Sequence, residues 1–146
     1  MQRIAFDLDE TLGVPLIDGA TMVGWQNRPG CLELLTRLRS RFTLCLWSVS
    51  NRRYVDKAIS FGLGDWFAES YSWDELPARW KDVRQIRVDF LVDDSPHHRE
   101  SARALGLESA YIVVPQYGSP EDAADPLAWV RLVETAVREG RFEEAL

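Results

Sequence analysis

Four short apolar runs alternate along the chain with longer amphipathic segments. The runs cover residues 4–6, 42–47, 90–92 and 111–114. Runs of this length that stop at polar residues are typical of strands buried in a parallel sheet. A further short strand is expected within 66–72. The pattern therefore predicts a mostly parallel sheet of about five strands.

The segments between these runs show the spacing of helices. Cys31, Leu34, Leu35 and Leu38 recur on one helical face, and Asn51 is a good N-cap for the next helix. Helices are predicted at 31–39, 52–61, 96–105 and 126–137, with a short helical turn at 81–86. Strands that alternate with helices predict a three-layer α/β fold of Rossmann-like type, with helices on both faces of the sheet.

Residues 13–30 interrupt this alternation. The segment contains glycines and prolines throughout, which excludes a helix and favours a loop or small hairpin. No other segment has the composition of a linker, and a chain of 146 residues fits one compact domain. We therefore expect a single domain over 1–146, in which 13–30 forms a flap or lid.

Composition and charge narrow the range of functions. The net charge of -6 disfavours general binding to nucleic acids. Cys31 and Cys45 lie in apolar segments without the spacing of metal ligands, so we expect reduced thiols in the core. The sequence contains no apolar run long enough to span a membrane, so a cytoplasmic protein without a membrane partner is expected.

Polar side chains follow three of the predicted strands. Asp7 and Asp9 come after the first strand, Ser48 after the second, and Asp93 and Asp94 after the run at 90–92. The carboxyl ends of parallel strands meet at one edge of the sheet, so these groups should converge. Clustered carboxylates repel one another unless they share a proton or bind a cation. Oxygen ligands without histidine or cysteine favour Mg²⁺, which predicts a magnesium site that takes a phosphate substrate.

Several other polar residues have two interpretations each. Ser48 could donate a hydrogen bond to a phosphate oxygen or simply begin a helix. Lys81 could neutralise charge on the phosphate and on a carboxylate, although most lysines face solvent. Arg52 could bind an anionic substrate or lie on an exposed helix face. His97 and His98 begin a predicted helix and are expected at the surface or the helix end.

Four sequence motifs resemble those of the haloacid-dehalogenase-like (HAD) phosphatases. The segment DLDETL at 7–12 resembles the first motif, DxDxT. LWSVS at 46–50, WKDV at 80–83 and LVDDSP at 91–96 resemble the second, third and fourth motifs, in the same order along the chain. The combination is most similar to the branch that contains the RNA polymerase carboxyl-terminal-domain phosphatases and the small magnesium-dependent phosphatases.

This resemblance implies a role for each motif residue. Asp7 would attack phosphorus to give an aspartyl phosphate, while Asp9 would protonate the leaving oxygen and later deprotonate water. Mg²⁺ would bind Asp7, the backbone carbonyl of Asp9, and Asp94. Asp93 would contact these ligands instead of the ion, or would bind the ion through a water molecule. The residues expected at the phosphoryl group are Ser48, Val49, Arg52 and Lys81.

The resemblance therefore implies a HAD-type hydrolase of phosphoric monoesters. Two alternatives remain open, namely a non-catalytic module that recognises phosphate and a phosphotransferase that uses the same phospho-aspartate. The short segment between Ser48 and Lys81 leaves no room for the insertion of the polymerase-domain phosphatases or for a large cap domain. An open site of this kind is compatible with a phosphorylated protein, a small metabolite or a nucleic-acid end.

Overall fold

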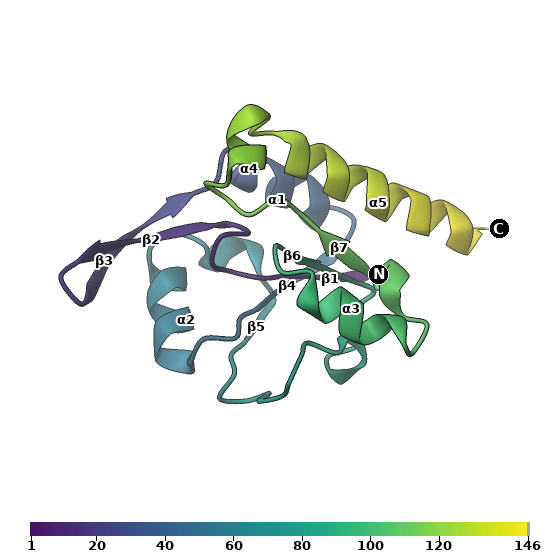
Figure 1. Ribbon diagram of the computed structural model, residues 1–146, viewed down its shortest axis with the longest axis horizontal. Coiled ribbons are helices and arrows are strands. Elements are labelled where there is room, and N and C mark those ends of the chain that lie inside the picture. Colours follow the sequence, from purple (N-terminus) through teal and green to yellow (C-terminus); the bar gives the residue numbers. More distant parts are fainter. Residues whose placement is uncertain (146) are drawn as a thin grey trace.

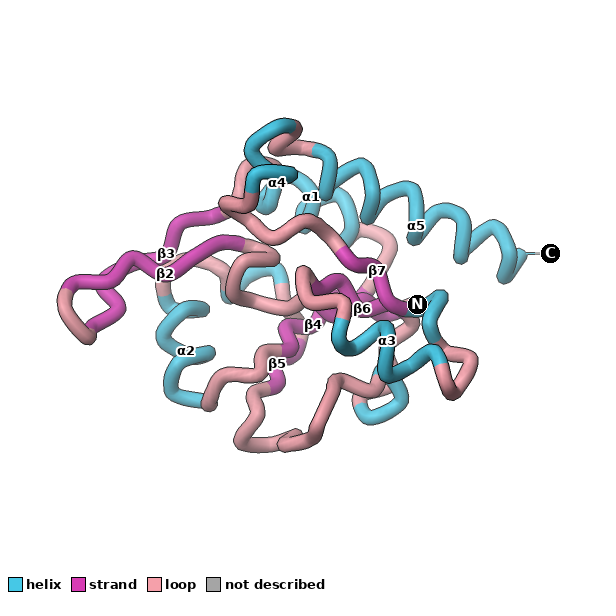
Figure 2. The backbone as a smooth tube through the Cα atoms, in the orientation of Figure 1, coloured by secondary structure: helices cyan, strands magenta, loops and turns pink. Residues whose placement is uncertain are grey.

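A parallel sheet lies at the centre of the computed structural model, which describes residues 1–145 (Figures 1 and 2). The five strands lie in the order β5-β4-β1-β6-β7, and every neighbouring pair is parallel. Their bounds are β1 (Arg3–Phe6), β4 (Thr43–Trp47), β5 (Glu69–Tyr71), β6 (Phe90–Asp93) and β7 (Tyr111–Val113). The predicted α/β fold with a parallel sheet is confirmed.

Helices cover both faces of this sheet because alternate residues of each strand point to opposite sides. On one face, apolar side chains of β1, β4 and β6 pack against α1 (Cys31–Arg39), α2 (Arg52–Ser60) and α5 (Ala128–Ala145). The other face packs against α3 (His97–Arg103) and the segment around a 3₁₀ helix at Val83–Gln85. Cys31 and Cys45 are free and buried in these two layers, as predicted.

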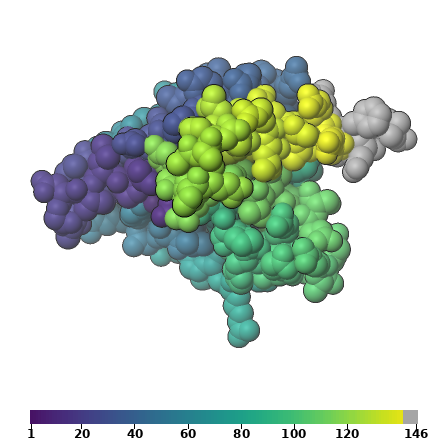
Figure 3. Space-filling model, turned by 45° about the horizontal axis from the view of Figure 1, so that its top comes forward, coloured from purple at the N-terminus to yellow at the C-terminus, as the bar shows by residue number. Residues whose placement is uncertain are grey.

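The segment after β1 forms the hairpin that the glycine and proline pattern favoured. Strands β2 (Gly13–Asp18) and β3 (Thr21–Asn27) pair antiparallel as a separate two-stranded sheet. Gly13 is required at the base of the hairpin, because a Cβ atom there would lie 2.2 Å from the carbonyl oxygen of Gln26. Figures 1 and 3 show that the hairpin extends from the body of the molecule.

One helix was missed, and the start of the last helix was placed too early. The pair of Asp125 and Pro126 predicted the start of the final helix, but Asp125 follows a short helix, α4 (Pro120–Ala124), and α5 begins at Ala128. Ser119 and Pro120 carry the same signature of a polar cap and a first-turn proline, and the Ser119 hydroxyl accepts the backbone N–H of Asp122.

A buried arginine joins the base of the hairpin to this C-terminal region. The guanidinium of Arg28 is fully buried and forms an ion pair with Asp122 at 2.9 Å. It also packs over the rings of Trp129 and Tyr117 and donates a hydrogen bond to the carbonyl of Thr11. Because Thr11 lies in the loop between β1 and β2, Arg28 links that loop to Asp122 in α4.

The residues that the structure describes include no helix that is both long and apolar enough to cross a membrane.

Candidate active site

Asp7 and Asp93 lie side by side because β1 and β6 are neighbours in the sheet. The backbone N–H of Asp7 donates to the carbonyl of Val92 at 2.9 Å, which continues the β1–β6 ladder past the end of β1. Asp93 is the last residue of β6, and Asp94 comes directly after it. One carboxylate oxygen from each of Asp7, Asp93 and Asp94 lies within 4.8 Å of the other two. The structure thus brings together carboxylates from two of the three predicted strand ends.

The hydroxyl group of Thr11 connects this cluster to the loop after β1. Its oxygen lies 3.0 Å from Oδ2 of Asp7 and 2.9 Å from Oδ1 of Asp94, and it accepts the backbone N–H of Asp94. Glu10 adopts a positive φ of 65°, and the backbone N–H of Leu12 returns to the carbonyl of Leu8. This tight turn directs the Thr11 side chain back towards the strand ends.

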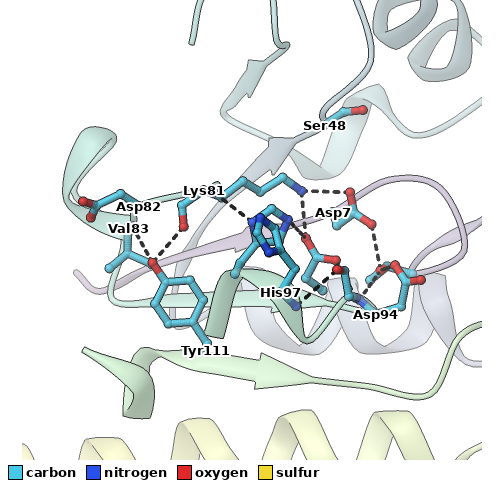
Figure 4. Close-up of polar contacts among 12 residues, drawn as sticks. Asp7, Ser48, Lys81, Asp82, Val83, Asp94, His97 and Tyr111 are labelled. Carbon is cyan, nitrogen blue, oxygen red and sulfur yellow. Dashed lines mark hydrogen bonds and ion pairs between the residues drawn. The ribbon is translucent and has the colours of Figure 1, made fainter. Parts of the chain in front are cut away.

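Lys81 places a buried ammonium between two of the carboxylates. Its Nζ donates to Oδ1 of Asp7 at 2.9 Å and to Oδ2 of Asp93 at 2.8 Å (Figure 4). The side chain is fully buried. Burial lowers the pKa of Lys81, but the charges of Asp7 and Asp93 together outweigh that effect, and the net pKa lies above the ordinary value. Lys81 is therefore a permanent cation in contact with Asp7.

Negative charge remains in excess around this lysine. Burial, followed by the charge of Asp7, raises the pKa of Asp94 to about 7. Burial also raises the pKa of Asp93, against the lowering effect of Lys81. Carboxyl groups that resist ionisation in this way are relieved by a nearby cation. The donor set consists of carboxylate oxygens, which fits a hard divalent ion such as Mg²⁺.

The hydrogen bonds distinguish Asp94 from Asp93. Both oxygens of Asp93 are engaged, because Oδ2 accepts from Lys81 and Oδ1 accepts the backbone N–H of Ser95 at 2.9 Å. Asp94, in contrast, shares the single hydroxyl of Thr11 with Asp7. This arrangement favours Asp94 as a direct ligand of a cation and Asp93 as the partner of the lysine.

Two side chains that sequence reasoning left outside the site hold the backbone of Lys81. The N–H of Lys81 donates to Nδ1 of His98 at 2.9 Å, and its carbonyl accepts the hydroxyl of Tyr111 at 2.8 Å. Tyr111 in turn accepts the N–H of Val83 (Figure 4). Burial and the positive charge of Lys81 lower the pKa of His98 to about 4, so its imidazole is neutral at pH 7.

His98 lies at the start of a helix, as expected, but not at the surface. Its side chain is buried, and Nε2 lies 3.6 Å from Oδ2 of Asp93. The preceding proline and the polar run predicted only a helix start, and that start is correct at His97. Nothing in the local pattern revealed that the first turn of α3 faces Lys81. His97 is exposed, and its Nε2 lies 2.9 Å from the carbonyl of Arg79.

Asp9 is held by a tyrosine from α2. Its carboxylate accepts a hydrogen bond from the hydroxyl of Tyr54. Burial raises the pKa of Asp9, and the bond from Tyr54 opposes that rise. The helical pattern placed Tyr54 on the apolar side of this helix, and its ring does pack against the core. No signal in the sequence indicated that its hydroxyl reaches Asp9.

Two of the residues expected at the phosphoryl group, Ser48 and Arg52, contact other parts of the protein. Ser48 is buried beyond the end of β4, and its hydroxyl accepts the backbone N–H of Ser50 at 3.0 Å. The guanidinium of Arg52 donates to Glu75, Asp56 and Ser70, which lie on and beside α2. The hydrogen bonds of the Arg52 guanidinium are therefore made to neighbouring groups of the protein.

A pocket of about 340 Å³ lies over the carboxylate cluster. The lysine and the four aspartates of the predicted site line it, namely Asp7, Asp9, Lys81, Asp93 and Asp94. Val49, Trp73, Arg79 and His97 are among the other lining residues. Ser48 and Arg52 are not among the described residues that line it.

Solved structures with the same arrangement of elements identify the fold. A protein of Thermotoga maritima described as a beta-phosphoglucomutase superposes with a TM-score of 0.65 at 12% identity, over 92% of this chain and 99% of that one. The chain has the fold of the haloacid-dehalogenase-like phosphatases. No protein-family model matches the chain, and no curated protein matches it.

Two structures of the RNA polymerase II CTD phosphatase Fcp1 also share this HAD fold. The fission yeast protein bound to beryllium fluoride has a TM-score of 0.57 at 15% identity, over 80% of this chain. A second Fcp1 structure has a TM-score of 0.59 at 14% identity, over 90% of this chain. The chain spans 42% and 49% of the length of these two proteins, respectively.

Proposed function

We propose that the protein is a Mg²⁺-dependent hydrolase of phosphoric monoesters that works through an aspartyl phosphate on Asp7. The observation that carries this proposal is the ammonium of Lys81, 2.9 Å from Oδ1 of Asp7 in the pocket that Asp94 also lines. A lysine in this position neutralises the nucleophilic carboxylate and the arriving phosphoryl group together. The HAD fold supports the proposal, because the solved neighbours include phosphatases.

In the first step a carboxylate oxygen of Asp7 forms a bond to phosphorus while the bond from phosphorus to the leaving oxygen breaks. Asp9 gives its proton to that oxygen, which departs as an alcohol. The raised pKa of Asp9 favours this proton-donating role. Lys81 stays protonated throughout, because the fully buried ammonium pairs with two carboxylates.

In the second step Asp9, now ionised, takes a proton from a water molecule that attacks the aspartyl phosphate. The bond from phosphorus to Asp7 breaks, so inorganic phosphate leaves and the carboxylate is restored. Asp7, Asp94 and the backbone carbonyl of Asp9 would hold Mg²⁺, which supplies a positive charge for the phosphoryl oxygens. The hydroxyl of Thr11 lies within hydrogen-bond distance of both Asp7 and Asp94 and would keep these two ligands close together.

The substrate class is a phosphate monoester presented at an open pocket. One solved neighbour acts on a polymerase domain and another is described as a mutase of a sugar phosphate, so both protein and metabolite substrates belong in a screen. The hairpin β2–β3 is the segment we propose as the flap over this pocket, since it leaves the site loop at Gly13.

The test is turnover of para-nitrophenyl phosphate, phosphorylated metabolites and phosphopeptides with and without Mg²⁺. We expect turnover that requires Mg²⁺, and an Asp7→Asn variant that loses at least about 10³-fold in kcat. Circular dichroism should show that this variant is folded. Acid-quenched wild-type protein should carry phosphate that hydroxylamine releases, as expected of an acyl phosphate.

Other outcomes would replace the proposal. Undiminished turnover by the Asp7→Asn variant would rule out Asp7 as the nucleophile. Phosphate binding without hydrolysis of any ester would indicate a recognition module. Transfer of the phosphoryl group to an added alcohol, in preference to water, would indicate a phosphotransferase.

A further inference from the structure

The hydroxyl of Tyr54 donates a hydrogen bond to Oδ1 of Asp9. These two residues come from different elements, the first turn of α2 and the loop after β1. Figure 1 shows α2 beside that loop, on the same side of the molecule as the hairpin. The contact therefore links a helix of the outer layer to the residue proposed as the proton donor.

Tyr54 is fixed at its backbone and along its ring. Its N–H donates to the side-chain oxygen of the N-cap residue Asn51 at 2.8 Å, which sets the position of the first turn of α2. Its ring is half-buried against the apolar core, with Val55 beside it in the interior. The hydroxyl is therefore delivered to Asp9 by a rigid side chain.

The backbone of Asp9 is fixed as well. Leu8 and Leu12, on either side of it, are fully buried, and Asp9 forms a β-bridge to Gly13. A carboxyl group on this backbone could still rotate about its side-chain bonds. The hydrogen bond from Tyr54 restricts this rotation, because Oδ1 must point towards the Tyr54 hydroxyl. The other oxygen, Oδ2, is left for hydrogen bonds in the pocket.

We propose that Tyr54 is a positioning residue for proton transfer, which holds Asp9 so that its Oδ2 faces the leaving oxygen of the substrate. This inference rests on the proposed function. The proton moves from Oδ2 to the leaving oxygen as the bond to phosphorus breaks, and Oδ2 later accepts a proton from the attacking water. Tyr54 keeps its own proton in both steps and touches neither the substrate nor phosphorus.

A purely structural role for Tyr54 makes a different prediction. If the ring merely packs α2 against the core, removal of the hydroxyl would affect all substrates alike. If the hydroxyl orients the proton donor, its removal matters only when the leaving oxygen needs a proton. An alkyl phosphate needs that proton, whereas dinitrophenyl phosphate releases a stable phenolate without it.

The experiment compares Tyr54→Phe with wild type on an alkyl phosphate, para-nitrophenyl phosphate and dinitrophenyl phosphate in saturating Mg²⁺. We expect kcat/KM to fall by about 30-fold on the alkyl ester, which is less than the about 10²- to 10⁴-fold that general acid catalysis contributes because Asp9 itself is retained, and by less than about twofold on the dinitrophenyl ester. The value of kcat/KM is diagnostic because it reports the step in which the leaving group departs.

Two further variants separate the possible failures. Tyr71→Phe is the matched control, because the Tyr71 hydroxyl also contacts a carboxylate, that of Glu69, at the surface; it should match wild type. Asp9→Asn should show a steeper leaving-group dependence than Tyr54→Phe. An equal loss on all three esters for Tyr54→Phe would overturn the inference. Activity retained by Asp7→Asn would instead overturn the proposed function.

Discussion

The backbone N–H of Lys81 donates a hydrogen bond to Nδ1 of His98 over 2.9 Å. This contact fixes the neutral imidazole with its proton on Nε2 and anchors the peptide that carries the buried ammonium. We predict that His98→Leu loses about 1 to 3 kcal/mol of unfolding free energy, since the N–H of Lys81 is left without an acceptor. His98→Asn retains an acceptor near the Nδ1 position and should recover most of that loss in urea unfolding. Equal stability of the two variants would contradict this role.

The same histidine should make stability depend on pH. The pKa of His98 is lowered to about 4 in the folded protein, below the value of about 6.5 of an unperturbed histidine. Between these pH values His98 is protonated in the unfolded chain but neutral in the folded chain. The contribution of His98 to stability therefore falls as the pH drops from about 6.5 to 4.

The charged and titratable groups that face His98 are Lys81, Asp93, His97 and Asp7. Because some of these groups titrate too, the measured quantity is the difference in unfolding free energy between wild type and His98→Asn. As the pH falls from about 6.5 to 4, wild type should lose up to about 3 kcal/mol of unfolding free energy relative to His98→Asn. A difference that is constant from pH 7 to pH 4 would contradict the prediction.

Removal of the Lys81 ammonium should damage both activity and folding. In Lys81→Met the carboxylates of Asp7 and Asp93 lose their buried partner, which costs about 3 to 5 kcal/mol at pH 7. The double variant Lys81→Met with Asp93→Asn should recover part of the stability in urea unfolding but none of the turnover. If the double variant regained activity, the charge of Lys81 would not be needed for the reaction.

Asp94 should control the affinity for Mg²⁺ more strongly than Asp93. Asp94→Ala removes a carboxylate oxygen that lies within 4.8 Å of an oxygen of Asp7 and of one of Asp93, so more Mg²⁺ should be required for half-maximal turnover and for thermal stabilisation. Asp94→Asn retains an oxygen donor and should lie between that variant and wild type. An unchanged Mg²⁺ requirement in Asp94→Ala would remove Asp94 from the proposed ligand set.

Arg52 should matter for the local structure of α2 rather than for substrate. Its guanidinium pairs with Asp56 and Glu75 at a partly exposed site, and such pairs contribute about 1 kcal/mol or less. Arg52→Met should therefore change the unfolding free energy by about that amount and leave kcat/KM within about twofold of wild type. A large rise in KM would instead support the alternative expected from the sequence, in which Arg52 binds the anionic substrate.

The strands of the sheet and the carboxylates at its edge could be predicted from the sequence for the same physical reason. A short apolar run that ends in aspartate, such as the run before Asp7, specifies both a buried strand and the polar group at its carboxyl end. The ammonium of Lys81 was expected beside a carboxylate, but the hydrogen bond from Tyr54 was not predicted, because it depends on a contact over a long sequence separation. The hydrogen bond from Tyr54 to Asp9 spans 45 positions. The apolar spacing along α2 predicted only that the ring of Tyr54 faces the core.

Arg28 gives the chain an order of assembly. Its partners Asp122 and Trp129 lie about a hundred residues after it, yet its guanidinium supports the carbonyl of Thr11 in the loop that carries Asp9. During synthesis, the first part of the chain therefore leaves the ribosome with a buried-type arginine that has no counterion. The site loop can reach its final shape only once α4 and the start of α5 are in place, so the geometry around Asp9 depends on packing between segments about a hundred residues apart.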